Sequence, residues 1–437
     1  ESDSIASVIS IAGPLNIDGE QCAHAMGKRV LGLHGEDDRN VPIAGGGPVG
    51  WACGLAARHA LGNTARVAVV ERDALPDAKS WTADKPLSAR VYTVAAGNLR
   101  WLASQDVVLD PARSATVSEM RVHGRNGAES LHIRATDIGE DELARVIEHE
   151  AMSFAIARAA VQAGVLLVRG EGVDLHDGGD VGVEAKLLEL ADRSLLQARV
   201  VVVADGVQSR LRDAAGLVAT CHAYPQHGVV ANLIAEAGHR DTAAQWFLPD
   251  GSILALLPLP DIAGASAMSM VWSTDPRRAA SLCAMADDEL LRAINAISGQ
   301  TIRLRAVAGR PRSFPLNLLR LADPVGKRVL VVGDAAHAMH PLAGQGVNVG
   351  LADARCLFDL WSSVAMAADD PGHPLLLARY RRQRYGPTLA MQMTTDGLFR
   401  LYNQSEHPLL MAAGDAGMRL LGRVPAFRRT LSTAAMQ

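Results

Sequence analysis

A glycine pattern between two apolar segments is the feature that most restricts how this chain folds. The segment 40–44 is a short strand candidate, and Gly45-x-Gly47-x-x-Gly50 follows it directly. A segment with helix-forming composition comes next, and residues 67–71 (VAVVE) are a second strand candidate. A strand, a glycine turn, a helix and a strand within about 30 residues form a βαβ unit. The pattern therefore predicts a parallel α/β sheet with a nucleotide at the turn.

Each glycine of the pattern has a physical reason to be there. The first permits a tight turn, the second lets the backbone approach a pyrophosphate, and the third lets the helix pack close to the strand. Glu71 ends the second strand, where a carboxylate can accept hydrogen bonds from the ribose hydroxyls of an adenosine. Pro42 departs from the pattern, because it removes a donor from a central strand. The motif predicts dinucleotide binding but does not distinguish FAD from NAD.

Composition excludes several classes of protein. With 437 residues, 49% of them hydrophobic and 21% charged, the chain has room for two globular domains. A net charge of −4 and an aromatic content of 4% argue against a nucleic-acid surface and against base stacking. No apolar run reaches the length of a membrane helix, and the first residues lack the basic start of a signal peptide. We expect a cytoplasmic protein, with peripheral contact to a membrane as a further option.

The cysteines are odd in number, far apart and never arranged as C-x-x-C. This spacing favours a reducing compartment, with neither a disulfide framework nor a thiolate metal site. We expect all of them to be small buried apolar side chains. They are Cys22, Cys53, Cys221, Cys283 and Cys356.

Two further segments carry short motifs after predicted strands. The first is Asp205-Gly206, which follows the apolar segment 200–204 and precedes a helix expected near Ser209. Taken alone it is an ordinary strand–turn–helix, with the aspartate as a turn former. The second is Gly333-Asp334, where the aspartate can accept a hydrogen bond from a sugar-like hydroxyl. A helix then opens around Pro341, Gly344, Gly346 and Asn348, and its N–H groups can face an anion such as a reduced flavin.

Taken together, the three segments resemble the class A flavoprotein monooxygenases, whose pattern is GxGxxG, then DG, then GD. Four other stretches narrow the resemblance to the ubiquinone-biosynthesis hydroxylases, which oxygenate polyprenyl-phenol rings. These stretches are 87–102, 245–261, 340–351 and 418–436. The similarity extends from residue 41 to the end of the chain, so that only residues 1–40 lie outside it.

The resemblance implies a role for individual residues. Glu71 would hold the adenosine ribose, Arg90 would lie near the FAD phosphates or ribityl chain, and Asp334 would bind the ribityl chain. Asp205 and Gly206 would belong to a motif shared between FAD and NAD(P)H binding. Pro341, Gly344, Gly346 and Asn348 would surround the isoalloxazine.

The chemistry implied by the family needs no protein nucleophile. NAD(P)H reduces FAD, O2 adds to give a flavin hydroperoxide, and an electron-rich phenol takes up the distal oxygen. His337 and His340, beside Pro341, are candidates for a proton role, although a structural hydrogen-bonding role is favoured. A metal site is not expected, because His-x-x-His lacks a third ligand. Residues 254–260 (LALLPLP) line the ring pocket or a prenyl channel, or they form plain sheet core.

The expected fold is α/β, with a Rossmann-like FAD-binding domain, an inserted β-sheet substrate domain and a helical C-terminus. Helices are expected near 142–162 and over 287–298, and the chain is expected to return to the α/β core at 312–316 (RSFPL). The division is 1–40 unassigned; 41–112, 139–215 and 312–400 FAD-binding; 113–138 and 216–311 substrate-binding; 401–437 a helical tail.

The tail interleaves arginines with apolar residues and contains no acid after Asp415. It forms either an interfacial surface that collects a membrane-dissolved substrate or a helix packed on the core. Its arginines are Arg419, Arg423, Arg428 and Arg429. Three alternative functions stay open: a hydroxylase of small soluble phenols or other secondary metabolites, a flavin-linked reductase, and a non-catalytic FAD-binding subunit of a biosynthetic complex.

Overall fold

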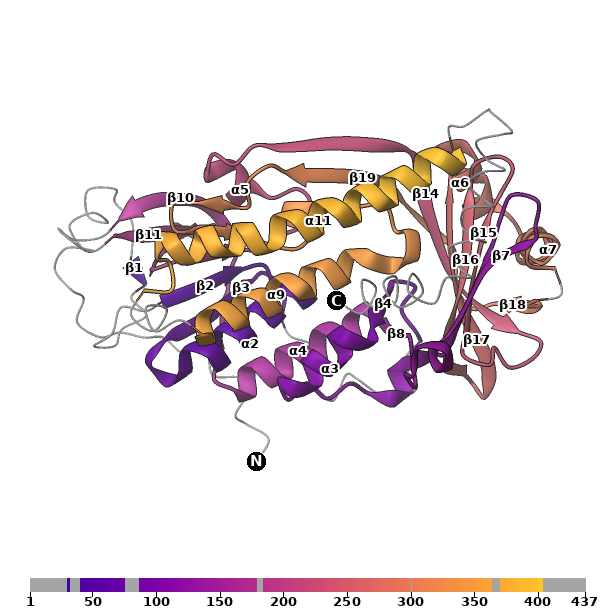
Figure 1. Ribbon diagram of the computed structural model, residues 1–437, viewed down its shortest axis with the longest axis horizontal. Coiled ribbons are helices and arrows are strands. Elements are labelled where there is room, and N and C mark those ends of the chain that lie inside the picture. The colour runs from indigo at the N-terminus through magenta and orange to yellow at the C-terminus, as the bar shows by residue number, and fades with distance from the viewer. Residues whose placement is uncertain are drawn as a thin grey trace.

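A six-stranded sheet forms the centre of the larger half of the molecule (Figure 1). The computed structural model describes residues 30–31, 40–74, 86–178, 184–299, 301–363 and 370–403. The strand order is β20-β21-β13-β2-β3-β9, and every pairing except that of β20 with β21 is parallel. The strands are β2 Asn40–Ala44, β3 Arg66–Glu71, β9 Leu166–Arg169, β13 Val201–Val203, β20 Val325–Gly326 and β21 Val329–Val331.

The two faces of this sheet are covered differently, as the alternation of side chains along β2 requires. Val41 and Ile43 point into a core shared with helices, whereas Ala44 packs in a core shared with a second sheet. The helices are α2 Pro48–Leu61, α3 Ala96–Ser104, α4 His149–Gln162 and α9 Gln345–Ser363. The second sheet, of order β1-β12-β11-β10, contains Val30–Leu31, Leu195–Ala198, Ala185–Leu190 and Gly172–Gly178. The result is a three-layered α/β unit.

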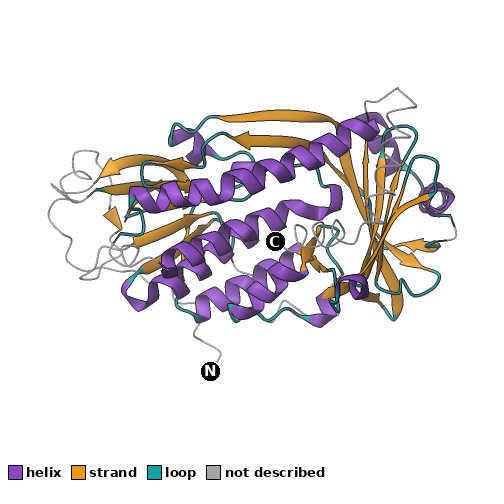
Figure 2. Cartoon of the chain, in the orientation of Figure 1, coloured by secondary structure: helices purple, strands orange, loops and turns teal. Residues whose placement is uncertain are grey.

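An eight-stranded sheet stands at the other end of the molecule (Figure 2). Its order is β18-β14-β17-β16-β15-β6-β7, with β19 paired to β14. Two helices, α6 Pro276–Ala284 and α7 Asp287–Ser298, cover one apolar face. The strands are β6 Glu119–His123, β7 Glu129–Arg134, β14 Ala219–Ala235, β15 Thr242–Phe247, β16 Ile253–Ile262, β17 Ala265–Thr274, β18 Leu304–Val307 and β19 Arg312–Leu321.

Two elements connect the halves. A three-stranded sheet of β4 Val91–Ala95, β8 Ala144–Glu148 and β5 Ser114–Val117 packs its apolar side against the eight-stranded sheet. The helix α11, Pro374–Asn403, runs from the α/β unit to the eight-stranded sheet (Figure 1). Its last turns place Phe399 and Tyr402 in a small apolar cluster with Phe247 of β15. The expected α/β class with an additional β-sheet is confirmed.

Several details differ from the expectations. The helix predicted near 142–162 begins only at His149, because residues 144–148 pair with β4 as the strand β8. The segment 312–316 does not return to the α/β core, since it begins β19 and pairs with β14. The helix α6 was not predicted, although Asp275 accepts hydrogen bonds from its first N–H groups and a proline opens it.

The structure also bears on the expectations about the cysteines, about Pro42 and about membrane helices. Cys221 is exposed on β14, so the expectation that every cysteine is buried is wrong there. Cys22 and the basic tail lie outside the described residues. Pro42 lies within the central strand β2 and pairs with β3, so the sheet tolerates the missing donor. None of the described helices is long and apolar enough to cross a membrane.

Candidate functional site

The turn before α2 can be built only with glycine at two of its three motif positions. Gly45 has a φ of +111°, and a Cβ there would overlap the carbonyl group of Ala204 at the end of β13. A Cβ at Gly50 would overlap the carbonyl oxygen of Gly45. A Cβ at Gly47 would meet nothing within 4 Å. The turn is therefore tightly packed on the protein side and open over Gly47, where a ligand would approach.

The N-terminus of α2 has the properties of an anion site. Gly47 provides no side-chain cap, and the first turn contains no acidic residue. The helix therefore presents uncapped N–H groups and the positive end of its dipole to the open space. These features fit the pyrophosphate of a dinucleotide.

Glu71 lies beside this turn, at the end of β3. Its Oε2 accepts a hydrogen bond from the amide of Gly46 at 2.6 Å, and its Oε1 accepts one from the amide of Asp73 at 3.0 Å. Gly46 must be a glycine here, because a Cβ would lie 2.7 Å from Cγ of Glu71. Both carboxylate oxygens keep a lone pair that can accept a ribose hydroxyl. The position agrees with the role expected for Glu71.

The Asp205-Gly206 segment is joined to the first motif through Ala204 and to the third through Arg212. The Asp205 carboxylate accepts hydrogen bonds from the start of α5 (Arg210–Ala214), as the turn-forming interpretation expects. Gly206 has a φ of +88°. Arg212 is buried, and its guanidinium donates to the carbonyl of Ala335 at 3.1 Å. Arg212 was not predicted, because only the folded contact reveals its role.

The Gly333-Asp334 segment packs directly against the first turn of α2. Gly333 has a φ of +59° and precedes the short helix α8, Asp334–His337. A Cβ at Gly333 would lie 3.1 Å from Val49 of α2, and a Cβ at Gly350 of α9 would lie 2.5 Å from the same side chain. Val49 thus fills a notch between two glycines. The structure thereby places the three predicted segments around one helix N-terminus.

Asn348 fixes the N-terminus of α9 to β4. Its Oδ1 accepts from the amide of Ala95 at 2.9 Å and from the side chain of Asn98 at 3.0 Å. Its Nδ2 donates to the carbonyl of Thr93 at 2.8 Å and to that of Gly344 at 3.3 Å. The protein therefore uses all four hydrogen-bonding positions of the Asn348 amide. Asn348 positions the turn around the expected isoalloxazine site, and direct contact with the isoalloxazine would come from neighbouring residues.

Arg90 and Asp334 both lie near Tyr92. The Arg90 guanidinium is 5.6 Å from the centre of the Tyr92 ring, and the Tyr92 hydroxyl lies 2.9 Å from Nδ1 of His149. Burial raises the pKa of Tyr92 to about 12, Arg90 opposes the rise and Asp334 adds to it. Burial and Arg90 lower the pKa of His149 to about 4. Gly346 also borders this region, since a Cβ there would lie 3.9 Å from Oδ1 of Asp334.

His337 and His340 both make buried hydrogen bonds within the protein. Nε2 of His337 lies 2.6 Å from the carboxylate of Asp353. Nε2 of His340 lies 3.2 Å from Oε1 of Gln226, and its ring stacks on Phe399. Burial lowers the pKa of His340 to about 3, so its imidazole is neutral at physiological pH. These contacts support a structural role for both side chains. Pro341 lies directly before the turn Leu342–Gly344 that leads into α9.

The 254–260 stretch divides between two cores. Leu254 and Leu256 point into the core under α6 and α7, which is the plain sheet role. Leu259 packs on the other face, in the apolar cluster that faces the three-stranded sheet. Only this second face is directed towards the α/β unit.

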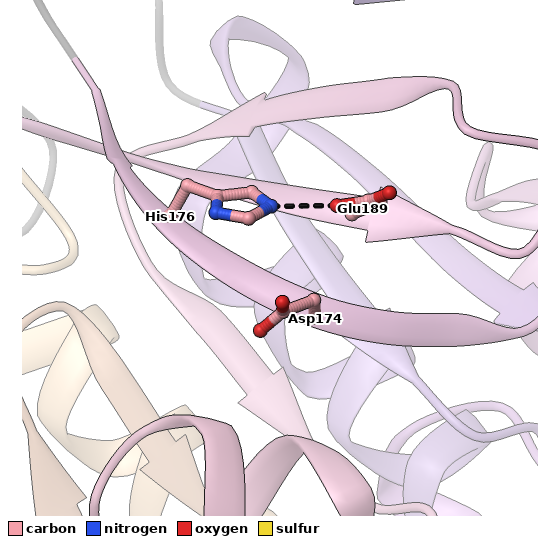
Figure 3. Close-up of side chains that lie close together, drawn as sticks. All are labelled: Asp174, His176 and Glu189. Carbon is pink, nitrogen blue, oxygen red and sulfur yellow. Dashed lines mark hydrogen bonds and ion pairs between the residues drawn. The ribbon is translucent and has the colours of Figure 1, made fainter. Parts of the chain in front are cut away.

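One group among the described residues has the composition of a metal site. Asp174 and His176 of β10 and Glu189 of β11 have ligand atoms within 4.8 Å of one another (Figure 3). His176 and Glu189 form a cross-strand pair at 2.6 Å, and Asp174 accepts the amide of Leu175. These partners account for the three side chains without an ion.

Comparison with known proteins identifies the family of this chain. The family described as FAD binding domain matches residues 38–395. The chain belongs to the class A FAD-dependent monooxygenases. The ubiquinone biosynthesis monooxygenase COQ6 of Mus musculus is 29% identical over 88% of this chain and 88% of its own. That of Rattus norvegicus is 30% identical over 85% of this chain and 86% of its own. The ubiquinone hydroxylase UbiL of Rhodospirillum rubrum is 33% identical over 56% of each chain.

Solved structures of lower identity agree on the fold of this monooxygenase. The p-nitrophenol 4-monooxygenase PnpA of Pseudomonas putida has a TM-score of 0.68 at 18% identity, over 91% of this chain and 97% of its own. PqsL of P. aeruginosa has a TM-score of 0.67 at 19% identity, over 87% and 99%. The predictions of an FAD cofactor, a monooxygenase activity and this family are confirmed.

Proposed function

We propose that this monooxygenase hydroxylates the aromatic ring of a polyprenyl phenol during ubiquinone biosynthesis, with NAD(P)H as reductant and O2 as the oxygen donor. The observation that carries the proposal is the similarity to ubiquinone biosynthesis monooxygenases along almost the whole of both chains. The identity to these relatives, 29–30%, is also higher than the 18–19% identity to the solved structures of p-nitrophenol 4-monooxygenase PnpA and PqsL. FAD, once reduced, supplies the activation of O2.

The chain's own residues would hold this cofactor in three places. The N-terminus of α2 would bind the pyrophosphate, with Glu71 on the adenosine ribose. Asp334 would accept a ribityl hydroxyl, and Arg90 would lie beside the phosphates or the ribityl chain. The turn at Gly344 and Gly346 would place the N-terminus of α9 at the pyrimidine edge of the isoalloxazine. The dipole of a helix without an acid in its first turn stabilises negative charge there.

The substrate ring would lie between this turn and the inner face of the eight-stranded sheet. That face carries apolar side chains such as Leu257 and Leu259, which exclude water from an oxygen transfer that water would interrupt. A polyprenyl tail dissolves in a membrane, so we place the enzyme, which we expect to be cytoplasmic, at the membrane surface. The basic tail after Asp415 would make that contact, alone or within a biosynthetic complex.

The test is mass spectrometry of lipid extracts from a strain that lacks this gene. We expect quinone to disappear and a prenylated phenol that lacks one oxygen to accumulate. Complementation with the wild-type gene or with Asp323→Asn, a half-buried residue outside the proposed site, should restore quinone, whereas Asp334→Ala should not. Unchanged quinone, in a strain shown to contain no second hydroxylase, would overturn the proposal and favour a small soluble phenol as substrate.

A further inference from the structure

A buried carboxylate in α9 has three partners, which lie in two other parts of the chain, residues 333–337 and α11. Asp353 is 1% exposed. Its Oδ2 accepts the amide of Gly333 at 2.9 Å and lies 2.6 Å from Nε2 of His337. Its Oδ1 accepts Nε of Arg384, from α11, at 2.6 Å. One side chain thus joins the Gly333-Asp334 turn, the end of α8 and the long helix α11.

We propose that Asp353 is the positioning residue of the Gly333-Asp334 turn, held in place by Arg384, and that it sets the affinity and the properties of the bound flavin. This inference rests on the proposed FAD site, because Asp334 is the expected partner of the ribityl chain.

The first argument concerns the freedom of Gly333. Its φ of +59° and its missing side chain leave this residue with a wide choice of conformations unless its backbone is held. Its carbonyl accepts the amides of Ala336 and His337, both at 2.9 Å. Its amide donates to the carboxylate of Asp353. The direction in which Asp334 leaves the strand therefore depends on the carboxylate.

The second argument concerns charge. A buried carboxylate is costly unless it is paired and hydrogen-bonded. Burial acts to raise the pKa of Asp353, but His337 and Arg384 outweigh it and hold the pKa well below its usual range. Arg384 also donates to the carbonyl of Val349 at 3.0 Å, one turn before Asp353. The carboxylate is therefore an anion in a fixed orientation, and its bond to Gly333 is charge-assisted.

The third argument is the position of this network behind the cofactor contacts. Gly350, three residues before Asp353, and Gly333 together enclose Val49 in the first turn of α2. A shift of α9 relative to Gly333 would disturb the turn and the pyrophosphate-binding helix at the same time. His337, Asp353 and Arg384 also border a cavity of about 220 Å³, so water has room to replace a shortened side chain at Arg384.

The experiment measures FAD binding in the full-length protein, by fluorescence titration of the apoprotein, together with the visible spectrum and the midpoint potential of the holoprotein. Asp353→Asn should weaken FAD binding about tenfold or more, as loss of a charge-assisted hydrogen bond does. It should also shift the flavin absorption band and the potential. His337→Gln, which keeps a donor for Oδ2, should stay near the wild type, whereas His337→Leu should not.

Arg381→Gln is the matched control, because Arg381 also lies on α11 but pairs with Asp323 in an exposed ion pair at 2.8 Å. It should leave FAD affinity, spectrum and potential unchanged, while Arg384→Gln should weaken binding several-fold. If Asp353→Asn does not fold, Arg384→Gln and the two His337 variants carry the test. A folded Asp353→Asn with wild-type affinity, spectrum and potential would overturn the inference, as would an equal effect of Arg381→Gln. A wild-type protein that binds no FAD would instead contradict the proposed function.

Discussion

At the scale of single residues, the ribose contact that we propose for Glu71 depends on a carboxylate that the backbone holds in place. Its carboxylate is already oriented by the amides of Gly46 and Asp73. A ribose that binds there finds the acceptor in place, so little side-chain freedom is lost on binding.

Glu71→Gln should weaken FAD binding by about tenfold, because a charged acceptor for the ribose hydroxyls becomes a neutral amide. The measurement is fluorescence titration of apoprotein with FAD. Asp73→Asn, two residues further along and exposed, is the matched control and should change affinity less than twofold, as roughly expected for a surface charge. Equal affinities for Glu71→Gln and the wild type would remove Glu71 from the site.

His340 makes the stability of the protein depend on pH. Its pKa falls from 6.5 to about 3 on burial, so the unfolded chain takes up the proton first as the pH is lowered. The contribution is complete above pH 6.5 and is lost between pH 6.5 and about 3. In this window the free energy of unfolding should fall by up to about 1.4 kcal/mol per pH unit because of this one residue.

Urea unfolding of the wild type and of His340→Phe at several pH values between neutral and about pH 5 tests this prediction. His340→Phe should show a shallower pH dependence, whereas His222→Gln, on the exposed part of β14, should not change the slope. The same slope in His340→Phe and the wild type would contradict a buried neutral imidazole.

Residues that belong to a short local motif could be predicted from the sequence. Residues whose contacts lie far away in the sequence could not. The spacing of Gly45, Gly50 and Glu71 along the chain predicts their places at the turn and at the end of the second strand. Asp353 and Arg212 are ordinary helix residues until the chain folds, because their partners lie far away in the sequence. No local pattern contains that information.

At the scale of elements, α2 packs closely on α9 because Gly350 has no side chain at the contact. Gly350→Ala should destabilise the protein by about 1–3 kcal/mol, because its Cβ would lie 2.5 Å from Val49. Gly397→Ala, in α11 with nothing within 4 Å, should instead stabilise it by about 1 kcal/mol. Thermal unfolding of the two apoproteins measures both changes. Stabilisation by both substitutions would show that helix propensity, and not packing, decides these positions.

The errors at this scale have a common cause. Residues 144–148 (ARVIE) contain good helix formers and were assigned to the helix that follows, but β4 and β5 lie on either side of them as pairing partners. The segment 312–316 likewise joins the neighbouring strand β14. Strand pairing overrides local propensity, and the sequence does not reveal which strands become neighbours.

At the scale of the whole molecule, the proposed cofactor joins segments that are hundreds of residues apart. FAD at about one hundred times its dissociation constant should stabilise the fold by about 2.7 kcal/mol. Hydrogen exchange should slow at 45–50, 333–337 and 344–349 when FAD is added to the apoprotein. It should stay unchanged in α7, Asp287–Ser298, on the far side of the eight-stranded sheet. Uniform protection, or none at these three segments, would contradict the assembled site.

The most direct test of the central claim is to give the purified holoenzyme a polyprenyl phenol, NAD(P)H and heavy-isotope O2, and to analyse the product by mass spectrometry. The account predicts a ring-hydroxylated product that carries one heavy oxygen, and no product from the apoprotein without added FAD. A product whose new oxygen comes from water, or consumption of NAD(P)H without oxygen transfer to any prenylated phenol, would contradict it.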